Sequence, residues 1–356
     1  MPVNAPAVAR MLGREAEEGR PRGCRAAPSR RVSLVTALPI SVVVACHTDE
    51  RWPTLVRSIE SAAAQQPRPQ AIVVAVDNNP GLTARLRQSG LDIQVVENHD
   101  ERGASSTRNA GAAVADTEYL AFLDDDSFAQ PGWLTSLLAP FADTQVVGTG
   151  GPVEPDWRVP RPAWFPDEFA WVVGASYTGL PTVDAPVRNV WSVNMAVRRD
   201  VFVAVGGFRR DFGKVGRTSR PEDTDLCIRM SSSTPDGCWV YSPGAVVRHE
   251  VPAERSTIQY FLRRSFWEGQ GKAEMARMLG HDRGLSSEKA WLLRTVPAGI
   301  ARHLVAAVRT RDRREAAQVA ALIAGTAAAG AGAALAVVRR GAFRRAAGRR
   351  RDAAVT

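Results

Sequence analysis

Three carboxylates stand in a row, Asp124-Asp125-Asp126, directly after the apolar run Tyr119–Leu123. Neighbouring carboxylates repel one another unless a cation neutralises them. A hard divalent ion such as Mg²⁺ or Mn²⁺ takes oxygen ligands and keeps coordination positions for substrate phosphates. Asp is also common in solvated turns, but no Gly or Asn-Gly turn signal follows this run. The triplet therefore predicts a site for a divalent metal and a phosphate-bearing substrate.

A second acidic pair, Glu222-Asp223, precedes an apolar helical stretch that contains Leu226, Ile228 and Met230. Acids in the first turn of a helix interact favourably with the helix dipole, which is one explanation for the pair. The other explanation is chemical, because a carboxylate beside a reacting hydroxyl can act as a general base. From the residues alone both explanations stay open.

The elements that must position these acids alternate between strands and helices. Continuous apolar strands joined by helices predict a parallel sheet that is covered on both faces, the α/β class. In such sheets ligands bind outside the carboxyl ends of the strands. We predict strands at Ile40–Ala45, Ala71–Val76, Ile93–Val96 and Tyr119–Leu123, and helices at Trp52–Gln65, Leu82–Gln88 and Ser105–Ala115.

Polar clusters follow three of these predicted strands at the point where each strand ends. They are His47-Thr48-Asp49-Glu50, Asp77-Asn78-Asn79 and Asp124-Asp125-Asp126. The carboxyl ends of parallel strands meet at one edge of a sheet, so we expect the three clusters to form a single site. This position makes His47 and Glu50 candidate substrate-binding residues alongside the acids.

Several motifs in this order resemble those of family 2 glycosyltransferases over about residues 39–272. They are Asp77, the run from Arg102-Gly103 to Gly111, Leu123–Asp126 and Glu222–Leu226. Members of this family are inverting enzymes with the GT-A fold, which is Rossmann-like with a mostly parallel central sheet. The segments 150–157 and 249–255 are similar to a bacterial and archaeal subgroup. Members of that subgroup act on cell-surface, lipid-linked or natural-product acceptors.

The resemblance implies roles on the donor side of the site. Asp77 matches the aspartate that contacts the nucleotide base, although an Asp before Pro80 is also expected to cap a turn. Arg108 would lie near the base or the diphosphate, whose oxygens suit a guanidinium fork. Asp124 and Asp125 match positions that contact the ribose and the metal shell. The metal ligands implied are Asp126, His249 and Asp124.

On the acceptor side, the family pattern makes Asp223 the catalytic base and Glu222 a supporting, substrate-binding residue. Inversion by direct displacement requires that an acceptor hydroxyl lose its proton in the transition state. The nucleoside diphosphate that leaves is stabilised by a divalent metal, so no second carboxylate is needed to protonate it. In this chain Pro221 stands where the family often has Gly.

Aromatic and basic residues of the second half are further candidates. Trp157 and Trp164 have faces that stack well on sugar rings, but such residues also pack into ordinary cores. Downstream, the segment 260–272 resembles the part of the family that closes over the donor diphosphate. Arg264 or Lys272 would then contact phosphate, although a surface helix explains either residue equally well.

Composition and charge bound the domain organisation. The 356 residues are 45% hydrophobic and 23% charged, which excludes a fully disordered chain, a collagen-like fibre and a multi-span membrane protein. The net charge is +4 over residues 1–31, +9 over residues 301–356 and −4 between them. Because the basic residues lie at the two ends, they favour membrane lipid over nucleic acid as a partner.

We predict three regions: a disordered Arg-rich leader, a GT-A domain with a nucleotide-sugar half and an acceptor half, and a basic helical tail. The tail contains an amphipathic segment, Trp291–Val308, and an uncharged Ala-rich segment, Ala316–Val338. Such a pair fits a helical hairpin on a membrane surface, a membrane span or packing against the catalytic domain. The predicted bounds are 1–36, 37–280 (37–130 and 131–280) and 281–356.

The sequence thus predicts a metal-assisted, inverting hexosyl- or deoxyhexosyltransferase that uses a nucleoside-diphosphate sugar and Mn²⁺ or Mg²⁺. The acceptor is a hydroxyl of a glycan, a lipid-linked or a natural-product molecule. We expect a cytoplasmic protein, peripheral at the inner face of the cell membrane through an anionic surface. The alternatives are a sugar-nucleotide nucleotidyltransferase, which lacks support because no Gly-rich loop follows the first strand, and a non-catalytic glycan- or lipid-binding adaptor.

Overall fold

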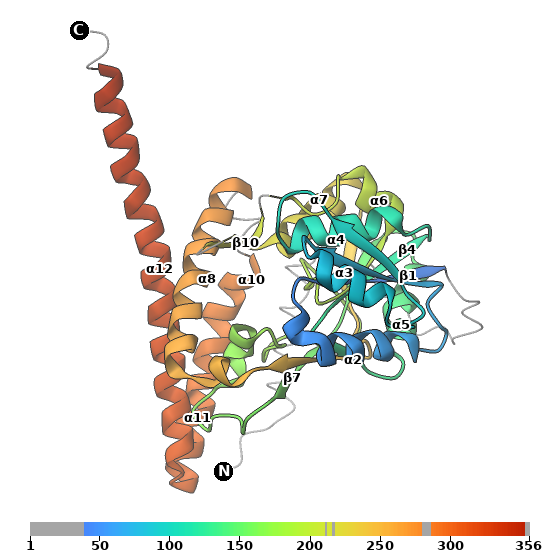
Figure 1. Cartoon of the computed structure of the whole chain (residues 1–356). Coiled ribbons are helices and arrows are strands. Elements are labelled where there is room, and N and C mark those ends of the chain that lie inside the picture. The colour runs from blue at the N-terminus through green and yellow to red at the C-terminus, as the bar shows by residue number, and fades with distance from the viewer. Residues whose placement is uncertain (1–38, 211, 216–217, 280–285, 353–356) are drawn as a thin grey trace.

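The computed structural model describes residues 39–210, 212–215, 218–279 and 286–352. The predicted leader, 1–36, lies outside these residues. An α/β unit built on a twisted sheet forms one part of the molecule, and long helices line one side of it (Figure 1). The last of these helices, α12 (Arg313–Asp352), runs alongside α8 (Ile258–Leu279).

The first half of the sheet is parallel, as predicted. Its strands are joined by helices that begin at local signals: Pro53 lies in the first turn of the first helix, and the side chain of Asn79 caps the second by accepting from Leu82 N. The strands are β1 (Ile40–Cys46), β2 (Ala71–Asp77), β3 (Gln94–Asn98) and β4 (Tyr119–Asp124), and the helices are η1 (Asp49–Arg51), α2 (Trp52–Ala63), α3 (Pro80–Arg87) and α4 (Ala104–Val114).

Beyond β4 the sheet becomes mixed. The order of its strands is β3-β2-β1-β4-β9-β6-β12-β8, and β9 runs antiparallel to both of its neighbours. The edge strand β8 is also antiparallel to β12. The parallel half therefore matches the expectation, and the other half adds two reversed strands. These strands are β6 (Val146–Gly150), β8 (Ala185–Val187), β9 (Asn194–Arg198) and β12 (Cys238–Tyr241).

A small sheet of order β5-β13-β7 positions the histidine predicted to bind metal. In it, β13 (Val247–Val251) pairs with β5 (Ser127–Ala129) and with β7 (Val153–Trp157). His249 lies opposite Ser127, and Glu250 N donates to the carbonyl of Asp126 at 2.9 Å. His249 is therefore inside a strand.

Further short elements complete the α/β unit and the helical side. They are α5 (Trp133–Leu138), η2 (Ala139–Ala142), η3 (Asp167–Val173), α6 (Arg199–Ala204), β10 (Gly213–Val215), β11 (Thr218–Arg220), α7 (Glu222–Ser233), η4 (Ala253–Ser256), α10 (Ser286–Ala290), η5 (Trp291–Thr295) and α11 (Val296–Thr310). The helix predicted after Glu222-Asp223 is confirmed as α7. The predicted division near residue 280 falls between α8 and α10.

Apolar residues on both faces of the sheet form the core. Alternate residues of β1 point to opposite faces: Val42 and Val44 pack with Leu55 of α2, and Val43 packs with Phe122 on the other side. All five side chains are fully buried. This packing fixes the strands from both faces, so the strand ends that carry the polar clusters are held rigidly.

The helices α8 and α12 pack with their backbones in contact. A Cβ atom added to Gly269 would lie 1.9 Å from the carbonyl oxygen of Ala329, and one added to Gly332 would lie 2.0 Å from that of Phe266. Small residues thus allow this close approach, which accounts for the Ala- and Gly-rich composition of 316–338. Leu322 of α12 is buried in a third cluster together with aromatic residues of η3 and α8.

Among the described residues, Arg313–Val338 is the one helix that is long and apolar enough to cross a membrane by length and composition. Only 22% of its most apolar window is buried within the protein. The packing on α8 shows that part of this helix contacts the rest of the protein. Its remaining surface is free to contact something else.

Candidate active site

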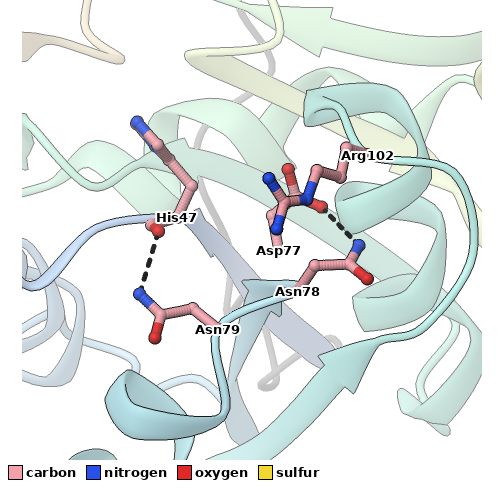
Figure 2. A pocket seen from close by; sticks show the side chains of 5 residues that line it. All are labelled: His47, Asp77, Asn78, Asn79 and Arg102. Carbon is pink, nitrogen blue, oxygen red and sulfur yellow. Dashed lines mark hydrogen bonds between the residues drawn. The ribbon is translucent and has the colours of Figure 1, made fainter.

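A cavity of about 400 Å³ opens at the carboxyl ends of β1 and β2. Figure 2 shows the five side chains that line it: His47, Asp77, Asn78, Asn79 and Arg102. Two of them, His47 and Asp77, were predicted to bind substrate. Residues of two of the three predicted polar clusters therefore line this cavity, whereas the acidic triplet Asp124–Asp126 does not.

Asp77 is held by hydrogen bonds at both carboxylate oxygens. Its Oδ1 accepts from Nδ2 of Asn98 and from Nδ2 of Asn78, each at 3.1 Å, and its Oδ2 accepts from Gly103 N at 3.0 Å. Register places Asn98 beside Asp77 on the neighbouring strand β3. The carboxylate therefore ties the end of β2 to the start of α4 while it lines the cavity.

Three residues of this cavity were not among the predicted site residues: Asn78, Asn79 and Arg102. Asn78 has a positive φ of 48°, a conformation that Asn tolerates well, and it turns the chain sharply after β2. Asn79 Nδ2 donates to the carbonyl of His47 at 3.2 Å and so joins the first two strand ends (Figure 2). For Asn78 and Asn79 the signal in the sequence was the strand-end position that they share with Asp77, whereas Arg102 lies just before α4.

Glu50 does not join this group. It is exposed in η1 and is not among the residues that line this cavity or the one beside Asp223. Its backbone N–H donates to the hydroxyl of Thr48, which caps the short helix. A direct contact between Glu50 and substrate stays a prediction.

The acidic triplet divides between two cationic partners. Asp124 Oδ1 accepts from Nη2 of Arg108 at 2.7 Å. Nη1 of Arg51 lies 3.1 Å from Oδ1 of Asp125 and 3.0 Å from Oδ2 of Asp126. Sequence reasoning missed Arg51, which stands at the start of α2, close after the end of β1. The carboxylate of Asp124 is therefore paired with a different cation from those of Asp125 and Asp126.

His249 lies next to the third carboxylate, as the metal prediction requires. Its Nε2 is 3.4 Å from Oδ1 of Asp126. Burial would raise the pKa of Asp126, but the hydrogen bond from His249 and the nearby positive charges lower it to about 2. Burial and the charge of Asp126 raise the pKa of Asp125 to about 7.

The residues present fit a divalent metal that shares its ligands with a substrate. Among the described residues, no group of three or more His, Cys, Asp or Glu side chains is arranged to hold a metal alone. Mg²⁺ sites, however, commonly use one or two protein ligands together with substrate phosphates and water. Asp126 and His249 would supply two such ligands, and Oδ2 of Asp125 and Nδ1 of His249 are buried without a partner in the described part of the chain.

Arg108 connects the acidic triplet to the predicted catalytic base. Its side chain is 6% exposed, and Nη1 lies 3.7 Å from Oε1 of Glu222 at the start of α7. Burial would lower the pKa of Arg108, but Asp124, Glu222 and Asp223 together raise it, so it stays charged. One buried cation thus faces three carboxylates.

Glu222 and Asp223, in the first turn of α7, have raised pKa values. Burial first, and then the charge of Asp223, raise the pKa of Glu222 to about 8. Burial also raises the pKa of Asp223, although Arg108 and hydrogen bonds with Ser192 oppose this. Oδ1 of Asp223 is buried and has no hydrogen-bond partner within the described residues. A carboxylate oxygen that is unpaired and more basic than usual has the properties of a general base.

A second cavity, of about 180 Å³, lies beside these acids. It is bounded by the loop before β9, the first turn of α7 and one face of α8. Arg264 and Lys272, which were predicted as phosphate contacts, both line it. The full lining is Asn189, Trp191, Pro221, Glu222, Asp223, Thr224, Arg264, Glu268, Gly271 and Lys272.

The tryptophans singled out in the sequence lie elsewhere. The ring of Trp157 packs against Phe165 at 5.3 Å between centroids, and that of Trp164 packs against Phe261 at 5.4 Å. Both belong to the aromatic cluster between η3 and α8, so the packing interpretation applies to them. The tryptophan beside Asp223 is Trp191, which the sequence analysis did not select.

Comparison with known proteins decides the family. The profile described as Glycosyl transferase family 2 matches residues 41–206. A glucosyl-dolichyl phosphate glucuronosyltransferase of Haloferax volcanii is 32% identical over 243 residues, which are 67% of this chain and 77% of that protein. The chain belongs to glycosyltransferase family 2. The predicted enzyme class, a glycosyltransferase, is therefore confirmed over the nucleotidyltransferase and the binding adaptor.

Two further comparisons agree with this assignment to glycosyltransferase family 2. The succinoglycan biosynthesis protein ExoM of Rhizobium meliloti is 29% identical over 241 residues, covering 65% of this chain and 74% of that protein. Among solved structures, a mannosyltransferase of Pyrobaculum calidifontis in complex with GDP-Man and Mn²⁺ superposes with a TM-score of 0.50 and 17% identity. That match covers 82% of this chain and 87% of the other, and it confirms the predicted GT-A fold.

Proposed function

We propose that the protein transfers a sugar from a nucleoside-diphosphate sugar to an acceptor hydroxyl with inversion, and that Asp223 is the general base. The observation that carries this proposal is the state of Asp223: buried, with a raised pKa and an unpaired Oδ1 in the wall of a cavity. Such an oxygen can accept the proton of a hydroxyl that enters this cavity.

The donor occupies the other cavity, at the ends of β1 and β2. Its volume of about 400 Å³ lies in the usual range for a small-ligand site. Amides of Asn78 and Asn79 and the guanidinium of Arg102 offer hydrogen bonds to a nucleoside, and Asp77 and His47 complete the wall. The solved mannosyltransferase that shares this fold holds GDP-Man, which supports a nucleotide-sugar donor here.

A divalent metal, held by Asp126 and His249, would neutralise the charge that develops on the departing diphosphate. Mn²⁺ is present in the solved mannosyltransferase complex, which is consistent with this requirement. Asp124, whose Oδ1 is paired with Arg108, is a further candidate ligand through its other oxygen. Arg51 contacts Oδ1 of Asp125 and Oδ2 of Asp126, so its positive charge would compete with a metal at these acids.

The chain's own residues carry the proton transfer. Asp223 takes the proton of the acceptor hydroxyl as that oxygen attacks the anomeric carbon, and the diphosphate leaves from the opposite face. Arg108 keeps the three facing carboxylates from repelling one another and so holds Asp223 in position. No acid is needed for the leaving group, in contrast to hydrolysis of a glycosidic bond.

We further propose a lipid-linked acceptor and a peripheral position on the cytoplasmic side of an anionic membrane. The name of the relative from Haloferax volcanii includes a glucosyl-dolichyl phosphate, which is a lipid-linked molecule. In this chain Leu293 and Val308 are 76% and 80% exposed, and Arg294 and Arg309 lie one residue away from them. Apolar side chains beside arginines are suited to the surface of an anionic bilayer.

The donor chemistry is tested by a panel of sugar nucleotides with Mn²⁺, in which release of the nucleoside diphosphate is measured without an added acceptor. At least one donor should be cleaved slowly by water, and excess EDTA should abolish the release. Cleavage of no member of the panel would contradict the proposed function. Full release in EDTA would contradict the role of the metal.

A further inference from the structure

The cavity beside Asp223 has a size and a lining that identify what it binds. Its volume of about 180 Å³ is smaller than the 300 Å³ or more typical of sites for drug-sized ligands. A space of this volume accommodates about one ring-sized group. Apart from Pro221 and Gly271, every lining residue carries a side chain that can form hydrogen bonds.

Helix α8 forms one wall of this cavity and is supported from behind by α12. Arg264, Glu268 and Lys272 follow one another at intervals of four residues, so they share the helix face that lines the cavity. The opposite face presents Phe266 and Gly269 to the backbone of α12. The C-terminal helix therefore fixes the position of the wall that faces Asp223.

The charged side chains of this wall form a ladder, that is, a row of alternating positive and negative charges. Its members are Arg264, Glu268, Lys272, Glu288 and Arg188. Nη1 of Arg264 lies 2.7 Å from Oε2 of Glu268, and Nζ of Lys272 lies 3.6 Å from Oε1 of the same residue. Lys272 also contacts Glu288 of α10 at 2.7 Å, and Arg188 binds Glu288 with two hydrogen bonds of 2.7 and 2.9 Å. Every cation of the ladder is therefore already neutralised by a carboxylate.

This neutralised ladder disfavours a phosphate as the occupant. A phosphate would have to displace Glu268 or Glu288 from its cation, and it would face the carboxylates of Glu222 and Asp223 across the cavity. A sugar ring can bind without breaking these ion pairs, because it is uncharged and its hydroxyls both donate and accept hydrogen bonds. The alternating ladder offers acceptors and donors side by side.

Trp191 provides the apolar surface that a sugar ring also needs. Its indole lies in the loop before β9, partly buried, with its ring centroid 6.1 Å from that of Tyr177. Aromatic rings pack well on the apolar faces of sugars while polar groups around them bind the hydroxyls. Trp191 is the only aromatic residue among those that line the cavity.

From this arrangement we propose that the cavity is the acceptor subsite and takes a single pyranose ring, packed on Trp191 and hydrogen-bonded by Arg264, Glu268 and Lys272. The inference rests on the proposed function, since the ring must present one hydroxyl to Asp223. It names the acceptor as a glycoside and assigns the α8–α12 pair a part in binding it. The sugar, not its aglycone or a phosphate, is what this cavity recognises.

The test measures binding without any donor, by saturation-transfer NMR with α- and β-methyl glycosides of glucose, mannose, galactose and N-acetylglucosamine. At least one glycoside should bind to the wild-type protein at millimolar concentration. Trp191→Ala should weaken its binding at least about tenfold, whereas Trp191→Phe should retain most of it. Lys272→Met should also weaken binding, and Arg263→Met, on the exposed side of α8, should not.

Binding of none of the eight glycosides would overturn the proposal, as would equal binding by wild type and both the Trp191→Ala and Lys272→Met variants. Displacement of a bound glycoside by inorganic phosphate would assign the cavity to an anion instead. Donor cleavage by water is measured on the same samples. Its absence would contradict the proposed function, while glycoside binding reports on the subsite alone.

Discussion

Replacing Arg108 by Met should destabilise the protein in a manner that depends on pH. The guanidinium is almost fully buried and faces the carboxylates of Asp124, Glu222 and Asp223. Removing one partner of a buried ion pair typically costs about 3–5 kcal/mol, because the remaining charge is left uncompensated. We expect a loss in this range at pH 8, where the three carboxylates carry the most charge.

At pH 5 the variant should lose less free energy of unfolding than at pH 8. The direction of this pH dependence follows from the pKa shifts. Arg108 lowers the pKa values of Glu222 and Asp223, so its removal raises them further above their unfolded values. A carboxyl group with a raised folded-state pKa costs stability as the pH rises from its unfolded pKa through its folded pKa. The Arg108→Met deficit should therefore grow between pH 5 and pH 8.

Urea unfolding of wild type and variant at the two pH values measures this deficit. Arg198→Met is the matched control, because Arg198 is also largely buried but donates mainly to the backbone carbonyls of Val146, Phe141 and Asp143. Its loss of stability should be similar at both pH values. A deficit for Arg108→Met below about 1 kcal/mol, or one that does not change with pH, would refute this account of the buried charge.

Three further predictions concern other parts of the site and its surroundings. Glu222→Gln should reduce the fall in stability between pH 5 and pH 8. The pKa of Glu222 is raised to about 8, so its ionisation in the folded state opposes folding. An unchanged pH profile of the free energy of unfolding in urea would contradict this. Arg51→Gln should bind Mn²⁺ more tightly in calorimetry, because Asp125 and Asp126 lose a competing cation; equal or weaker affinity would contradict the competition. The double variant Leu293→Ser/Val308→Ser should sediment less with anionic vesicles than the wild type does. High salt should release the wild-type protein from the vesicles. Equal sedimentation of the two proteins would place the membrane contact elsewhere.

The strands and helices of the first half could be predicted closely because their signals are local. Runs such as Ala71–Val76 are continuously apolar, and the residues that end them are polar, so both the strands and their ligand-binding edge follow from the sequence. The observed β1 and β4 each differ by one residue from their predicted ends. Helix α7 likewise begins at the predicted acidic pair.

The contacts that assemble the site could not be predicted locally. Arg51 binds carboxylates more than 70 residues away, and His249 meets Asp126 because β13 pairs with β5 across a long stretch of sequence. Trp191 and Trp157 have equivalent signals in the sequence, yet one lines a cavity and the other packs among phenylalanines and tryptophans. Tertiary packing alone separates such residues.

The most direct test of the central claim compares Asp223→Asn with the wild type in a sugar-transfer assay. The donor is a sugar nucleotide that the wild type hydrolyses, and the acceptor is a methyl glycoside that binds to the wild type. Calorimetry with the nucleoside diphosphate and Mn²⁺ establishes that the variant still binds the donor side. We predict unchanged nucleotide affinity, turnover lower by about 10²- to 10⁴-fold, and a wild-type product of inverted anomeric configuration. Turnover within about tenfold of wild type, or a product of retained configuration, would contradict the assignment of Asp223 as the base of an inverting transfer.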